Sequence, residues 1–280
     1  MQTVYLGNTL INDFYLGSQK VDDIIGGLIT ISDSNAFQFL QASGLIQNQT
    51  ISSAINQLCV DLKSSNLFNK FYALYPFVGN NASSSKYNLI NTGSYTLGLS
   101  GSWSYGNGIT GNGTNTYANT ALIPSTISNF ATGSSLMVYV TTNSAGGYDI
   151  GSETDTPTAR TYLISRYSNN TANTNFTNTS ISTSSLDSTG MWISEVSGSS
   201  QRLEIYKNTS SLVTPINSTS ANLSAAPLYI GANNFKNTSI TDYSSKTYAM
   251  AGIGKYFTST EVTTLYTIVQ SFETSMSRQV

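Results

Sequence analysis

Residues 247–266, TYAMAGIGKYFTSTEVTTLY, join an apolar, strand-like run to the start of a helix. Thr258 suits the N-cap position, and Glu261 three residues later completes a capping box. Beyond this box, apolar side chains recur at alternating intervals of three and four, as on one face of a helix: Val262, Leu265, Val269, Phe272 and Met276. This seam covers about two heptads, which is short for a coiled coil. The stretch therefore predicts a strand followed by a helix that packs against the sheet.

Between Tyr87 and Phe257 the pattern is that of an all-β chain. Short runs rich in Val, Ile, Tyr and Thr are separated by Gly, Asn and Ser, as in SLMVYVTT, TYLISRY, MWISEVSG and PLYIGA. The run RLEIYKN (202–208) alternates in polarity, which is typical of a strand. Strands spaced by turn residues, with no helices between them, indicate a sandwich or a barrel rather than a βαβ fold.

Helical spacing occurs in residues 45–75. Thr50 fits the N-cap position, and one helical face is marked by Ile51, Ile55, Leu58 and Leu62. The run LFNKFYALY (67–75) predicts a second short helix before Pro76. We therefore divide the chain into an N-terminal β arm (1–31), a helical connector (32–86) and a β-sandwich with a closing helix (87–280).

The composition excludes several classes of function. The chain carries 12 basic and 14 acidic residues, so it has no electrostatic footprint for nucleic acid. No apolar run approaches the ~20 residues that span a bilayer, and we expect no membrane insertion. The single cysteine, Cys59, excludes an internal disulfide framework, and histidine, the usual catalytic base, is absent. The start of the chain also lacks the pattern of a signal peptide.

The sandwich region resembles the concanavalin A-like, laminin-G-type jelly roll. The resemblance rests on four phrases in the family's order: GITGNGTNTYANT (108–120), MWISEVSG (191–198), RLEIYKN followed by PLYIGANN, and the stretch quoted above. One departure is that Thr209 follows Lys207 and Asn208 where the family has glycine. The resemblance implies a mainly β jelly-roll sandwich, preceded here by the β arm and the helical connector and closed by the C-terminal helix.

The chain as a whole resembles the structural proteins of tailed bacteriophages. The matching segments are LFNKFYALYPFVGNNASSSKYNLIN (67–91), EVTTLYTIVQSFETSMSRQV (261–280) and an initial Tyr-Leu-Gly segment. The resemblance implies a non-enzymatic virion component, such as a head-fibre, capsid-decoration or tail-associated protein. Such a protein is assembled in the host cytoplasm, and its partners are other virion proteins of the capsid or tail. A glycan-binding, receptor-recognising adhesin is the alternative, and a jelly-roll glycosidase is the second alternative.

The first residues contain a ten-residue repeat, VYLGNTLINDFYLGSQKVDDI (4–24), in which Tyr5, Leu6 and Gly7 return as Tyr15, Leu16 and Gly17. An isolated β-hairpin is marginal in water, so these apolar side chains need a surface supplied from outside. We expect the arm to be a docking segment that pairs with other copies or with a carrier protein. A homotrimer is the first expectation and a dimer the second. The alternative is a hairpin packed on the chain's own sandwich.

Catalysis and metal binding have few candidate residues. Glycoside hydrolysis needs two carboxylates about 5–9 Å apart, and Glu195 and Glu204 could face each other across a hairpin. The simpler interpretation makes them solvent-facing strand residues, so we expect no enzyme. Ca²⁺ prefers oxygen ligands, and the acidic residues Asp149, Glu153 and Asp155 could supply them. A solvated loop explains this cluster as well, and no cofactor is expected.

Aromatic side chains point to a glycan as a partner. Trp103, Tyr105 and Tyr117 flank a stretch rich in Gly and Asn, where rings could stack on a host-surface sugar while amides bond its hydroxyls. The alternative interpretation places Trp103 in the sandwich core, as we expect for Trp192.

Overall fold

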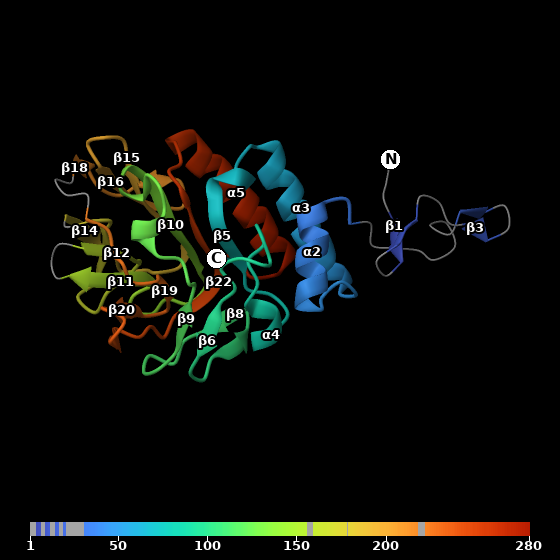
Figure 1. Cartoon of the computed structure of the whole chain (residues 1–280), viewed down its shortest axis with the longest axis horizontal. Helices are drawn as coiled ribbons and strands as arrows, with labels where there is room; N and C mark the ends of the chain where they lie inside the picture. Colours follow the sequence, from blue (N-terminus) through green and yellow to red (C-terminus); the bar gives the residue numbers. More distant parts are fainter. Residues whose placement is uncertain are drawn as a thin grey trace.

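The computed structural model describes residues 31–155, 159–177, 179–217 and 222–280, together with the backbone pairing of four short strands before residue 21. In this part of the chain two nine-stranded sheets form a β-sandwich, and helices pack on one side of it (Figure 1). Among the described strands, all pairs are antiparallel except one, between β11 (Ile150–Asp155) and β20 (Asn233–Phe235). The mainly β jelly-roll sandwich expected from the sequence is confirmed.

The first sheet lies between the second sheet and the helices. Its main path is β17 (Ser210–Ser211), β16 (Arg202–Lys207), β15 (Gly190–Ser197), β10 (Gly133–Val140), β22 (Thr247–Lys255), β8 (Gly108–Thr110) and β7 (Ser104–Gly106). Beside this path, β18 (Ile216–Asn217) pairs with β16, and β5 (Phe71–Pro76) pairs with β22.

The second sheet runs in the order β14 (Ser180–Ser184), β13 (Thr171–Asn175), β12 (Ala159–Ile164), β11, β19 (Tyr229–Ile230), β9 (Tyr117–Asn119) and β6 (Gly98–Ser100). Strand β20 joins it beside β11, and β21 (Ser239–Thr241) pairs with β20.

Strand β10 shows why the central strands read as continuous apolar runs. Leu136 and Val138 are buried in the core between the sheets, whereas Met137 and Tyr139 are buried in a second core beneath the helices. A strand covered on both faces has no polar side, so its sequence does not alternate.

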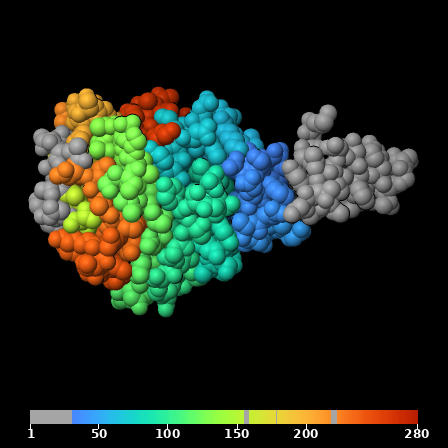
Figure 2. All heavy atoms as spheres, in the orientation of Figure 1, coloured from blue at the N-terminus to red at the C-terminus, as the bar shows by residue number. Residues whose placement is uncertain are grey.

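Four α-helices occur in the described residues: α2 (Ser34–Ser43), α3 (Gln49–Ser64), α4 (Ala82–Ser85) and α5 (Ser259–Ser275). Figure 2 shows the residues of α2 and α3, in blue to cyan, at one end of the described body. The capping box at Thr258 is formed, and the seam that follows it in α5 is buried. The cap of α3 is Asn48 rather than the expected Thr50. None of the described helices is long and apolar enough to cross a membrane.

The second helix expected over 67–75 is not formed. A single 3₁₀ turn covers Phe68–Lys70, and β5 follows and pairs with β22. The cause is burial on both faces, because Leu74 packs under the helices and Tyr75 packs between the sheets. The segment 32–86 therefore contributes a strand to the sandwich as well as helices.

The N-terminal repeat corresponds to two successive hairpins. Strands β1 (Val4–Leu6) and β2 (Thr9–Ile11) form the first, and β3 (Tyr15–Leu16) and β4 (Gln19–Lys20) form the second. Their registers match at an offset of ten residues, since Tyr5 pairs with Leu10 and Tyr15 with Lys20. The side chains of the expected docking residues, and both Gly7 and Gly17, lie outside the described residues.

Candidate functional site

A polar cavity of about 420 Å³ opens beside the hairpin of β7 and β8. We call it the threonine pocket; its lining residues are Tyr105, Gly106, Asn107, Thr110, Thr141, Thr142, Thr247, Ser277, Arg278, Gln279 and Val280. Tyr105 is half-buried, whereas Asn107, Thr142 and Gln279 are exposed. The pocket therefore combines one aromatic ring with hydroxyl and amide groups.

Sheet pairing places the threonines. Thr110 and Thr247 lie opposite each other on β8 and β22, and their hydroxyls are 2.8 Å apart. The backbone N–H of Thr141 donates to the carbonyl of Thr247 at 3.0 Å, which fixes the end of β10 beside β22. Thr141 Oγ1 is buried and has no hydrogen-bond partner in the described part of the chain. A hydroxyl both donates and accepts, so this atom has unused hydrogen-bonding capacity next to the pocket.

The cation in the pocket lining is neutralised within the protein. Arg278 Nε donates to Glu273 Oε2 at 2.8 Å, and both side chains are almost fully buried. The guanidinium also donates to the backbone carbonyls of Phe77 and Ala249. Arg278 therefore adds no unpaired positive charge to the lining.

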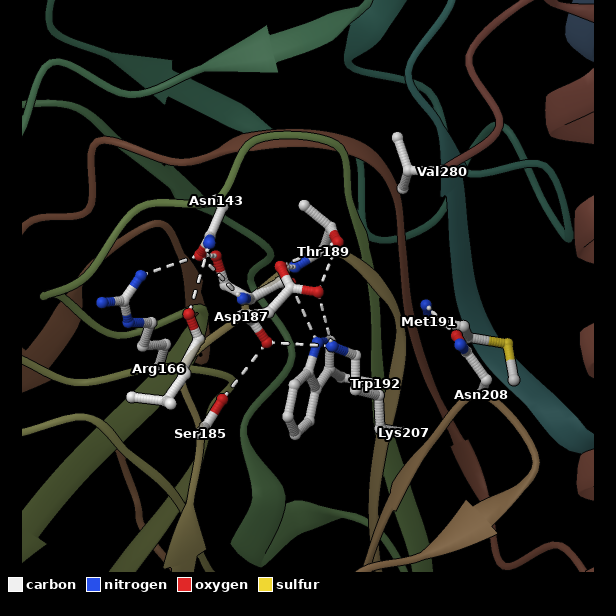
Figure 3. A network of polar contacts seen from close by, with 12 residues as sticks. Asn143, Arg166, Ser185, Asp187, Thr189, Met191, Trp192, Lys207, Asn208 and Val280 are labelled. Carbon is white, nitrogen blue, oxygen red and sulfur yellow. Dashed lines mark hydrogen bonds and ion pairs between the residues drawn. The ribbon is translucent and has the colours of Figure 1, made fainter.

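A loop between β14 and β15, residues 185–189, borders this region and is held by a polar network (Figure 3). Asp187 accepts hydrogen bonds from Thr189 and, at 2.8 Å, from Lys207 Nζ. Burial alone would raise the pKa of Asp187, but these hydrogen bonds outweigh it and lower the pKa below its ordinary value. The indole of Trp192 donates to the carbonyl of Ser188 at 2.9 Å. The side chains of Lys207 and Trp192 thus hold this loop in place.

Hydrogen bonds connect this loop to the threonine pocket. Ser188 Oγ donates to the carbonyl of Thr142 at 3.0 Å, and the N–H of Ser188 donates to Asn143 Oδ1 at 3.1 Å. Asn143 Nδ2 donates to the carbonyl of Leu186 at 3.3 Å. The side chain of Leu186 is 72% exposed, so the loop presents an apolar group to solvent.

The three aromatic residues singled out in the sequence do not share one cleft. Tyr105 lines the threonine pocket. Trp103 is 8% exposed and belongs to the core between the sheets, which agrees with the alternative interpretation. Tyr117 stacks on Tyr229, with ring centroids 4.8 Å apart. The polar residues of the pocket could not be predicted from any local sequence pattern, because the pairing of strands that are distant in the sequence brings them together.

The acidic residues considered for Ca²⁺ are engaged separately. Asp149 accepts from Lys246 and from Tyr248, each at 2.9 Å, inside the sandwich. Glu153 forms an ion pair with Arg160 at 2.8 Å, and the side chain of Asp155 lies outside the described residues. Among the residues that the structure describes, no three carboxylate, cysteine or histidine side chains are grouped as metal ligands.

Glu195 and Glu204 do lie opposite each other on β15 and β16, but they are not solvent-facing. Glu195 is fully buried and accepts a hydrogen bond from the N–H of Phe257, just before α5, and Glu204 is 7% exposed. Burial is the main cause that raises the pKa of Glu195 from 4.5 to about 8; the Phe257 N–H opposes the shift and the Glu204 carboxylate adds to it. A buried pair of this kind is closed to a polysaccharide.

Comparison with known proteins gives no match to a family model and no match to a curated protein. Among solved structures, a mutant of Trypanosoma rangeli sialidase with trans-sialidase activity is similar, at 13% identity and a TM-score of 0.54. Trypanosoma rangeli sialidase in complex with sialic acid is similar at 12% identity and a TM-score of 0.51. Each match covers 82% of this chain and 40% of the sialidase chain.

Domain 4 of AbnA, an extracellular GH43 arabinanase from Geobacillus stearothermophilus in complex with arabinotriose, aligns with a TM-score of 0.45. The identity is 13%, and the match covers 70% of this chain and 98% of that domain.

The two sialidase similarities agree with a jelly-roll β-sandwich, and at such low identity they establish the fold alone. They contradict the expected role as a structural component of a phage virion. The two sialidase structures come from a glycosidase, and nothing in them points to a virion. The bacteriophage resemblance rested mainly on two segments, residues 67–91 and 261–280. In the structure these segments form β5, α4 and most of α5, so they reflect the fold rather than a place in a virion.

Proposed function

We propose that this chain is a carbohydrate-binding protein whose binding site is the threonine pocket. The observation that carries the proposal is the half-buried Tyr105 in the wall of a polar cavity of about 420 Å³. A sugar has apolar C–H faces and a rim of hydroxyls. It therefore fits a cavity that offers a ring for stacking and neutral groups for hydrogen bonds. The sialidase solved with sialic acid makes sugars the first ligands to test.

Thr141 gives the proposal a second support. Leaving a buried hydroxyl without a partner costs free energy, and a sugar hydroxyl seated against Thr141 Oγ1 would remove that cost. Binding rather than hydrolysis is proposed, because the two opposed carboxylates Glu195 and Glu204 lie beneath the helices.

The first test is a glycan array with the full chain, followed by calorimetric titration of the best sugar. Tyr105→Ala should weaken binding by about tenfold through the loss of ring stacking. The matched control is Tyr117→Ala, which removes another half-buried tyrosine outside the pocket and should leave affinity unchanged. Equal losses in both variants, or no sugar bound on the array, would overturn the proposal.

Thr141→Val separates binding from folding. Valine keeps the shape of threonine and removes the unpaired hydroxyl, so the free energy of unfolding should not fall. Affinity for the sugar should fall nonetheless. A variant that binds as tightly as the natural chain would exclude a role for Thr141 in recognition.

A further inference from the structure

Arg166 differs from the other arginines of the chain. The sequence has four arginines, and in the described residues three of them form ion pairs: Arg160 with Glu153, Arg202 with Glu204 and Arg278 with Glu273. Arg166 is held instead by two neutral amides. Its Nη1 donates to Asn143 Oδ1 at 2.8 Å, and its Nε and Nη2 donate to Asn170 Oδ1 at 3.1 and 2.8 Å.

This arrangement fixes the guanidinium without neutralising it. The three hydrogen bonds use three of its five N–H groups and leave one on each Nη for another partner. A planar guanidinium with two such groups matches the two oxygens of a carboxylate, and its charge strengthens the hydrogen bonds. Because two asparagines already hold the side chain, little conformational entropy remains to be lost on binding.

The surroundings leave the charge available. Asp187 lies in the neighbouring loop, but its carboxylate is bound by Lys207 at 2.8 Å. Figure 3 shows Asn143 and Arg166 to one side of Asp187, with Lys207 and Trp192 to the other. Asn143 directly follows Thr142 of the threonine pocket and binds the carbonyl of the exposed Leu186. Arg166 is thus linked to the threonine pocket through Asn143, which holds its Nη1 and whose chain neighbour Thr142 belongs to the lining.

We propose that Arg166 binds the anionic group of an acidic glycan, a carboxylate or a sulfate, whose neutral sugar ring occupies the threonine pocket. The inference rests on the proposed function, because the pocket must bind the sugar ring before Arg166 can bind its charged substituent. It adds a class of ligand that the hydroxyl, amide and aromatic groups of the lining do not select.

The experiment compares three ligands that share one neutral core: lactose, sialyllactose and sulfated lactose, each titrated calorimetrically against the full chain at low and high salt. At least one acidic sugar should bind about 10- to 100-fold more tightly than lactose, which is the range for a charge-assisted hydrogen-bonded pair. The advantage should shrink at high salt. Comparison of the two acidic sugars identifies the anion that the site prefers.

Arg166→Gln should abolish this advantage while the affinity for lactose is unchanged. Arg166→Lys keeps the positive charge but loses the planar pair of N–H groups that can bind two oxygens at once. This variant should therefore keep only part of the advantage of the acidic sugars. The control is Arg202→Gln, which removes an arginine whose side chain is 54% exposed on β16 and should change nothing.

Two failures are distinguishable. If lactose binds in a Tyr105-dependent way and the acidic sugars bind no better, or if Arg166→Gln keeps their advantage, the role of Arg166 is wrong and the proposed function stands. If none of the three sugars binds, the role of Arg166 is wrong as well, whereas the proposed function fails only if the glycan array also shows no bound sugar.

Discussion

Glu195 is an acidic residue in a buried environment. Its carboxyl is fully buried on the helix side of β15, and Oε1 has no partner among the described residues. Its pKa is raised from 4.5 to about 8, chiefly by burial. Because the folded-state pKa lies above the unfolded one, the stabilisation is fully present below about pH 4.5 and is lost as the pH rises through about 8.

Glu195→Gln should therefore flatten the alkaline part of the stability curve. Between pH 5 and 9 the natural chain should lose on the order of 2–4 kcal/mol of unfolding free energy from this group, and the amide variant should not. Urea denaturation at both pH values measures the difference. Asp61→Asn on the surface of α3 serves as control and should follow the natural curve. A variant with an unchanged alkaline decline would show that Glu195 stays ionised at no cost.

Asp149 and Lys246 form an ion pair between the sheets. Both side chains are fully buried and 2.9 Å apart; Asp149 directly precedes β11 and Lys246 directly precedes β22. Lys246→Met should destabilise the fold by about 3–5 kcal/mol, because it leaves a buried carboxylate without its cation.

The double variant Asp149→Asn with Lys246→Met should recover part of that loss, since the remaining charge is removed as well. Chemical denaturation of the single and double variants measures the coupling. A double variant less stable than Lys246→Met alone would contradict this account of the pair.

At the scale of elements, the start of α5 is fixed by its own residues. Thr258 Oγ1 accepts from the N–H of Glu261 at 3.3 Å, and Glu261 Oε2 accepts from the N–H of Thr258 at 2.7 Å. Thr258→Ala should cost about 1 kcal/mol of unfolding free energy. Thr264→Ala, in the middle of the same helix, should cost nothing, because alanine has the higher helix propensity. Thermal unfolding of both variants tests the cap, and equal losses would argue against it.

Elements of this kind were predictable because their signals are local. A capping box and a 3-4 seam lie within one helix, so α5 could be predicted from the sequence. Strand β5 could not, because its pairing with β22 and its burial on both faces depend on residues far along the chain. The same holds for the site: Tyr105 was a candidate as an aromatic near glycines, whereas Thr141 and Thr247 meet only through β10 and β22.

At the scale of the whole molecule, the paired hairpins are separate from both sheets of the sandwich. Strand β1 pairs only with β2, and β3 only with β4, among the described strands. Each two-stranded hairpin therefore has two edges without a described partner. Open strand edges and marginal two-stranded sheets favour pairing with further strands. The tandem repeat supplies matching hairpins at a ten-residue spacing, so a second copy of the chain offers strands of the same pattern.

Deletion of residues 1–30 should therefore convert an oligomer, expected first as a trimer, into a monomer. Both cores of the sandwich are built from later residues, so the shortened chain should keep its fold. Light scattering coupled to gel filtration measures the mass of each form, and circular dichroism confirms that the sandwich is intact. In the full-length chain, Leu6→Asp with Leu16→Asp should have the same effect, because charges at strand edges oppose pairing. A full-length chain that is monomeric at high concentration would show that the repeat serves another purpose.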